Sequence, residues 1–173
     1  MPREAPRTRT SLCLIARRSE DGRREMLFGR KKLGFGKGKL AAVGGHVELG
    51  ETPAQAAARE VGEEVALFVD PSALEEVAAL TLRFPSRPEW DQQVTVFLAE
   101  TWSGLPRESE ELAPSWFPAE DLPLEEMWDD ARHWLPRVVA SERLVAEFTY
   151  AEDERTLLAA SVVPVSGGDP DGR

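Results

Sequence analysis

Cysteine is almost absent from the 173 residues of this chain, and long apolar runs are absent altogether. The single Cys13 cannot form an intrachain disulfide, and its apolar neighbours favour a buried structural thiol over a nucleophile. No apolar stretch approaches the roughly 20 residues of a membrane span, and the N-terminus lacks the apolar core of a signal peptide. We therefore expect a cytoplasmic protein with no membrane partner.

Positive charge is scarce beyond residue 39. The net charge is −10, with twelve Lys and Arg against four Asp and Glu in residues 1–39, and nine against twenty-seven in residues 40–173. Such an acidic chain is poorly suited to a general nucleic-acid surface, so we expect no nucleic-acid partner. The basic residues of the first segment are either solvated loop charges or a surface that faces a polyphosphate; they include Arg30, Lys31, Lys32, Lys37 and Lys39.

The length suits one domain with short tails. The composition predicts flexible ends at 1–10 and 165–173 and a folded domain over 11–164. Strands are predicted at 11–16, 26–28, 40–43, 77–84, 93–100, 144–150 and 156–163, a short strand or turn at 116–117, and helices after residue 52 and at 130–141. This pattern predicts an α/β fold with a mixed sheet between helices. No sustained apolar heptad is present, and we expect a monomer.

A capped helix start follows the glycine pair Gly44-Gly45. Thr52 is a suitable N-cap, Pro53 suits the first helical position, and Gln55 can complete a capping box. A stripe of small apolar residues would let this helix press closely against a sheet. The stripe consists of Ala54, Ala57, Ala58, Val61 and Val65.

The opposite stripe of the same helix is acidic. Glu60 and Glu64 are four residues apart, with Glu63 beside them, and like charges at this spacing repel by a few tenths of a kcal/mol. Gly62 between them costs roughly 1 kcal/mol relative to Ala. Two local penalties in one turn indicate a functional site, and three carboxylates near a glycine loop favour a hard divalent cation. The alternative is a solvated acidic face on an ordinary helix.

The spacing of these residues resembles the Nudix box. From Gly45, five residues lead to Glu51 and seven more to Arg59, after which come the helix glutamates and Leu67. Eight of the nine specified positions match. The exception is Ala66, which replaces a glycine at the C-terminus of the helix, where left-handed backbone is common. Alanine at this position predicts modest strain or a slightly extended helix. The resemblance implies the Nudix fold, an α/β/α sandwich with the box as a loop-helix-loop, and Mg²⁺-dependent hydrolysis of a nucleoside diphosphate linkage, with Mn²⁺ as an alternative ion.

The same resemblance assigns the metal ligands. It implies that Glu60 and Glu64 are the main ligands and that the backbone carbonyl of Gly44 adds another. Glu63 is implied as a further ligand or as a group that orients water. A Mg²⁺ site of a few carboxylates that leaves room for substrate phosphates fits this set.

Three further residues complete the implied catalytic set. Arg59 acts through ion pairs that position the acidic cluster, and Glu51 supports that network. Glu111 is our candidate for an additional carboxylate that helps to bind the metal or acts as a general base. The alternative for Glu111 is one acid among several in a solvated loop.

The flanking sequence resembles the oxidised purine nucleoside triphosphatases, the 8-oxo-dGTPase group that sanitises nucleotide pools. The resemblance runs from about residue 33 to residue 163 and includes segments 33–38, 115–117 and 127–134. It implies that Trp128 and Phe35 stack on a purine and that Asp130 reads the base edge, with Phe84 and Lys37 as further substrate contacts. Core packing is the alternative for Trp128 and, more so, for Trp134.

Two departures bear on the base. The group has a polar amide where this chain has Ala41, and a second aspartate where it has Ala131; Asp129 could replace that carboxylate if the helix start is shifted. The expected activity is hydrolysis of oxidised purine triphosphates such as 8-oxo-dGTP to the monophosphate and pyrophosphate. Alternatives are an ADP-ribose or dinucleoside polyphosphate hydrolase, a catalytically silent nucleotide-binding module and, disfavoured by the charge, an RNA-cap pyrophosphatase.

Overall fold

One mixed sheet and two α-helices make up the computed structural model, which describes residues 4–166. The strands are β1 (Thr8–Arg18), β2 (Arg24–Lys31), β3 (Leu40–Ala41), β4 (Val43–His46), β5 (Glu75–Arg83), β6 (Gln92–Ala99), β7 (Leu112–Pro118), β8 (Leu144–Tyr150) and β9 (Leu157–Pro164). The helices are α1 (Pro53–Val65) and α2 (Ala131–Val139), with short 3-10 turns at η1 (Pro71–Ala73), η2 (Pro88–Trp90) and η3 (Leu124–Glu126).

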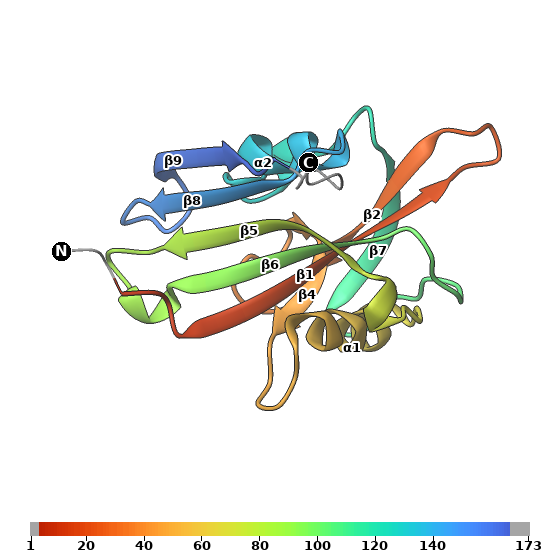
Figure 1. The fold of residues 1–173 in the computed structure, drawn as a ribbon, viewed down its shortest axis with the longest axis horizontal. Coiled ribbons are helices and arrows are strands. Elements are labelled where there is room, and N and C mark those ends of the chain that lie inside the picture. Colours follow the sequence, from red (N-terminus) through yellow and green to blue (C-terminus); the bar gives the residue numbers. More distant parts are fainter. Residues whose placement is uncertain (1–3, 167–173) are drawn as a thin grey trace, which may run out of the picture.

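The strand order is β3-β2-β1-β6-β5-β8-β9, with β4 also paired to β1 and β7 to β2. The pairs β1–β6 and β5–β8 are parallel and the other pairs are antiparallel. α1 packs on β1 and β4, whereas α2 packs near β8 and β9 (Figure 1). The predicted α/β fold with a mixed sheet is thereby confirmed.

The core is divided by the sheet into two apolar layers. Side chains alternate along β1, so that Leu14 joins the layer with Trp134 of α2, while Cys13 and Ile15 join the layer with Val61 of α1. Cys13 is fully buried, and burial raises the pKa of its thiol to about 12. The prediction of a buried structural thiol is confirmed. Within residues 4–166, neither α-helix is long and apolar enough to cross a bilayer.

Two segments differ from the sequence-based expectation. β1 begins at Thr8, inside the segment expected to be flexible, because Thr8 to Thr10 pair with the start of β6. β7 is seven residues long, although only residues 116–117 were predicted as a short strand or turn. Its Pro114 and Pro118 are tolerated because β7 pairs with β2 alone. The expected flexible tail lies mostly outside the described residues.

Candidate active site

The glycine loop and α1 have the local structure that the sequence predicts. The side chain of Thr52 accepts a hydrogen bond from the Gln55 backbone N–H, and the Gln55 side chain accepts one from the Thr52 N–H, so the capping box is complete. The buried face of α1 consists of Ala56, Ala57, Val61 and Val65. The helix ends at Ala66, whose φ of 59° lies in the left-handed region. The strain expected from replacing glycine there is present.

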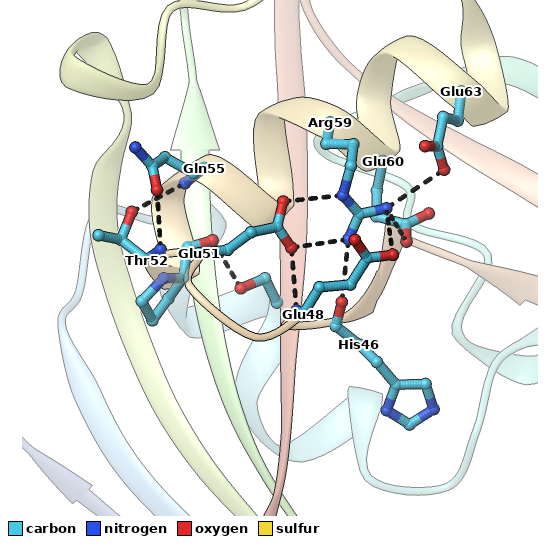
Figure 2. Close-up of polar contacts among 10 residues, drawn as sticks. His46, Glu48, Glu51, Thr52, Gln55, Arg59, Glu60 and Glu63 are labelled. Atoms are coloured by element: carbon cyan, nitrogen blue, oxygen red, sulfur yellow. Dashed lines mark hydrogen bonds and ion pairs between the residues drawn. The ribbon is translucent and has the colours of Figure 1, made fainter.

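Arg59 is the centre of an ion-pair network (Figure 2). Its Nε and Nη2 donate to the two carboxylate oxygens of Glu51 at 2.8 and 3.0 Å, a bidentate pair. Its Nη1 donates to Glu60 at 2.9 Å and to Glu63 at 3.2 Å, and its Nη2 also donates to the backbone carbonyl of His46. These contacts lower the pKa of Glu51 and raise that of Arg59. The Arg59 guanidinium thereby links His46, at the end of β4, and Glu51, in the loop that follows, to helix α1.

Besides accepting a hydrogen bond from Arg59, the Glu60 carboxylate lies against the glycine pair. A Cβ added to Gly45 would lie 2.5 Å from the Glu60 carboxyl carbon, and one on Gly44 would overlap the backbone of Ser11. Both glycines are therefore required by close packing: Gly44 lets β4 approach β1, and Gly45 leaves the space that the Glu60 carboxylate occupies.

Carboxylates gather at one end of a cavity. Glu60, Glu64 and Glu111 line it, together with Glu48, Gly44 and Gly45. Burial raises the pKa of Glu64 to about 8, and the charge of Glu60 and then of Glu111 adds to this, while a hydrogen bond from the Gly44 backbone opposes it. Burial also raises the pKa of Glu60, which Arg59 partly offsets. Without a cation, this end of the cavity does not readily hold its full negative charge.

This donor set fits a divalent cation. Within the described part of the chain, no three His, Cys, Asp or Glu side chains are already arranged as a metal site. The chemistry nevertheless fits, because Glu60, Glu64 and Glu111 are oxygen donors whose mutual repulsion a hard cation would relieve. Glu63 instead bonds to Arg59 with its side chain 60% exposed, and it does not line the cavity.

The cavity has a volume of about 740 Å³ and continues from the carboxylates to an aromatic end. Phe84 stacks on Tyr150 with ring centroids 5.0 Å apart and an interplanar angle of 7°. Phe35 stacks on Trp128 at 4.8 Å and 28°, and Trp90 lies 4.8 Å from Phe35. Phe35 and Trp128 were expected to stack on a purine. Because the two rings contact each other, a base would stack on a free ring face or separate them.

Asp130 is buried beside this aromatic end. Its carboxylate accepts hydrogen bonds from the Tyr150 hydroxyl and, at 2.7 Å, from Trp134 Nε1. Burial raises the pKa of Asp130, and that of Tyr150 is raised by burial and by Asp130. Asp129 accepts from the Leu157 N–H and pairs with Arg132. It does not line the cavity, so the carboxylate absent at Ala131 is not replaced from there.

Two lysines occupy different hollows. Lys31 lines the main cavity, and its Nζ donates to the Phe35 carbonyl at 2.8 Å. Lys37, the expected substrate contact, lines a smaller hollow with Lys39 and Arg155 on another side of Trp128. The sequence left two readings of the basic segment open, solvated loop charges or a surface that faces a polyphosphate, and the structure places one lysine of that segment, Lys31, in the lining of the main cavity. Sequence reasoning also missed Tyr150, Thr10 and Gln92, for which strand alternation was the only signal. It missed Trp90 as well, which lies in the 3-10 turn η2 and contacts Phe35.

Comparisons with known proteins agree with this geometry. Residues 7–138 match the model of the NUDIX domain. The chain is 36% identical over 137 residues to the oxidized purine nucleoside triphosphate hydrolase of Mus musculus, covering 79% of this chain and 85% of that protein. It is 38% identical over 125 residues to the protein of the same name from Danio rerio, covering 72% and 78%.

Solved structures show the same fold. The MutT protein of Bacillus halodurans superposes with a TM-score of 0.73 at 22% identity, covering 90% of this chain and 97% of that one. A MutT NUDIX hydrolase of Burkholderia pseudomallei gives 0.64 at 26% identity, covering 78% and 99%. The chain therefore belongs to the Nudix family of hydrolases, as the spacing of its glutamates indicated.

Proposed function

We propose that this Nudix hydrolase converts oxidised purine nucleoside triphosphates, such as 8-oxo-dGTP, to the monophosphate and pyrophosphate with Mg²⁺ or Mn²⁺. The observation that carries the proposal is that one cavity joins the carboxylate cluster to an aromatic wall with a buried carboxyl. Both curated relatives described above bear the name of this activity.

The dimensions support a nucleoside triphosphate. From β4, which carries Gly44 and Gly45, the sheet continues through β1, β6 and β5 to β8, which ends at Tyr150. Four strand spacings amount to about 19 Å. This length accommodates a triphosphate at the glycine end and a purine at the Phe84 and Trp128 end.

In this proposal the residues divide the work. Glu60 and Glu64, with the Gly44 carbonyl and, once released from Arg59, Glu63, would hold the divalent ion. Bound there, the ion would supply positive charge to phosphate oxygens and assist deprotonation of the attacking water. Arg59 and Glu51 keep the acidic side chains in position. Glu111 contributes to metal holding or accepts the proton of the attacking water. Water adds to phosphorus as the anhydride bond between the α and β phosphorus atoms breaks, and the products are the nucleoside monophosphate and pyrophosphate.

The remaining roles in this proposal belong to residues at the aromatic end of the cavity, where the base would bind. Asp130 faces the purine edge, while Phe84, Phe35 and Trp128 supply apolar and stacking contacts. Lys31 is better placed than Lys37 for a phosphate or sugar oxygen, because it lines the main cavity. We further propose a cytoplasmic monomer that acts on free nucleotides and on neither nucleic acid nor membrane.

A hydrolysis screen tests the proposal. It compares 8-oxo-dGTP, 2-oxo-dATP, the four ordinary dNTPs, ADP-ribose, a dinucleoside polyphosphate and a capped RNA, with Mg²⁺ and with products resolved by chromatography. A kcat/KM preference for an oxidised purine, giving monophosphate and pyrophosphate, is expected. A preference for ADP-ribose, the dinucleotide or the capped RNA would overturn the substrate assignment, and no turnover at all would favour a silent binding module.

A further inference from the structure

Thr10 and Gln92 are two polar side chains on the floor of the main cavity. Thr10 belongs to β1 and Gln92 to β6, the strands between β4 at the carboxylate end and β5 near the aromatic end. Gln92 is paired with Leu82, two residues before Phe84, whereas two strand spacings separate it from β4. Gln92 therefore lies under the base rather than under the phosphates of a bound nucleotide.

A hydrogen bond fixes the orientation of the Gln92 amide. Thr10 Oγ1 donates to Gln92 Oε1 at 2.8 Å, which turns the carbonyl side of the amide toward Thr10. The NH₂ side, with two donors, faces away from Thr10. Among residues 4–166, none accepts a hydrogen bond from this NH₂ group. It is thus available to a ligand in the cavity.

The other polar groups at the base end are already engaged or missing. Both carboxylate oxygens of Asp130 accept hydrogen bonds from Tyr150 and Trp134. Ala41 and Ala131 offer no side-chain hydrogen bond. The Gln92 NH₂ is therefore a free donor at this end, and a donor selects an acceptor such as a carbonyl oxygen.

We propose that Gln92, oriented by Thr10, recognises a carbonyl oxygen of the purine and so determines selectivity for the oxidised base. The inference rests on the proposed function, in which the substrate carries one more ring carbonyl than the ordinary nucleotide. This chain has Ala41 where the related group has a polar amide. The proposal therefore assigns discrimination between oxidised and ordinary bases to a residue on a different strand.

The test compares substrate pairs that differ in one carbonyl: 8-oxo-dGTP with dGTP at C8, and 2-oxo-dATP with dATP at C2. The Gln92→Leu variant keeps much of the volume and removes the donors. We expect the ratio of kcat/KM within one pair to fall about 3- to 10-fold, the size of one net hydrogen bond, and that pair identifies the carbonyl. The Gln93→Leu variant is the matched control, because its exposed side chain lies on the opposite face of β6.

A second pair of variants tests the orientation without changing Gln92. Thr10→Val keeps the shape and removes the hydroxyl, so the amide can turn and the same ratio should fall. Thr10→Ser keeps the hydroxyl and should retain the ratio. A merely structural role would change kcat/KM for both members of a pair equally and would leave the ratio unchanged.

The outcomes separate the two proposals. If the native enzyme prefers the oxidised bases but Gln92→Leu keeps every ratio within the range of Gln93→Leu, the role of Gln92 is refuted and the proposed function stands. If the native enzyme shows no preference within any pair, the proposed function fails and the inference fails with it. A ratio that falls in Gln92→Leu and Thr10→Val but not in the controls supports both.

Discussion

Replacing Gly45 by alanine should remove activity while leaving the fold intact. The added Cβ would lie 2.5 Å from the carboxyl carbon of Glu60, whereas ordinary carbon contacts begin at about 3.5 Å. The carboxylate must therefore retreat by about 1 Å, and its 2.9 Å bond to Arg59 must change with it. A displacement of this size at a reacting centre can cost about 100-fold in rate.

Stability should change little in this variant. The Gly45 φ is not in the left-handed region, and the group that the Cβ meets is the end of a side chain, which can move. We expect the free energy of unfolding to stay within about 1 kcal/mol of the native value. The assay is pyrophosphate release from 8-oxo-dGTP with Mg²⁺, together with denaturant unfolding and Mn²⁺ titration.

Gly62→Ala is the matched control within the same motif. Its added Cβ would meet nothing closer than the Leu67 carbonyl at 3.8 Å. Because glycine is unfavourable in a helix interior, this control should gain about 1 kcal/mol of stability and keep its activity. Full activity in Gly45→Ala, or a loss of activity that merely follows a loss of stability, would refute the argument.

Three further predictions concern the same motif. Glu64→Gln should abolish turnover. Because burial raises the pKa of Glu64 from its ordinary value of 4.5 to about 8 in the folded protein, the metal-free native protein should lose stability as the pH rises from about 4.5 to 8. Thermal unfolding with a chelator at pH 5 and at pH 8 should show a smaller loss of stability in the variant. Arg59→Lys keeps the charge but not the bidentate bond to Glu51, and should weaken Mn²⁺ affinity or kcat about 10- to 100-fold; native values would contradict the positioning role. Ala66→Gly should relieve the left-handed strain and raise the free energy of unfolding by about 1 kcal/mol in urea, and no gain would show that the strain is compensated.

The local part of the site was predictable because its causes are local. A capping box needs only Thr52 and Gln55 three residues apart, and helix geometry alone puts Glu60 and Glu64 on one face. The left-handed backbone at Ala66 follows equally from its place after the last helical turn. In each case the interacting residues are fewer than five positions apart, so periodicity suffices.

Contacts between distant segments could not be predicted in this way. Tyr150 reaches Asp130 from another element, and Phe35 meets Trp128 because the β2–β3 loop folds onto the start of α2. Two lysines of that segment, Lys31 and Lys37, end in different hollows because Lys31 closes β2 whereas Lys37 lies in the loop that follows. Spacing in the sequence contains no information about these directions.

The sequence by itself determined the family, the chemistry of the carboxylates and the helix that presents them, since all three depend on residue types at short, fixed spacings. The tertiary structure alone decided the shape of the base pocket, including the exposed donor of Gln92 beside Thr10. That pocket is assembled from strands whose order in the sheet differs from their order in the chain. Pairing between such strands depends on the fold as a whole, and local propensity does not encode it.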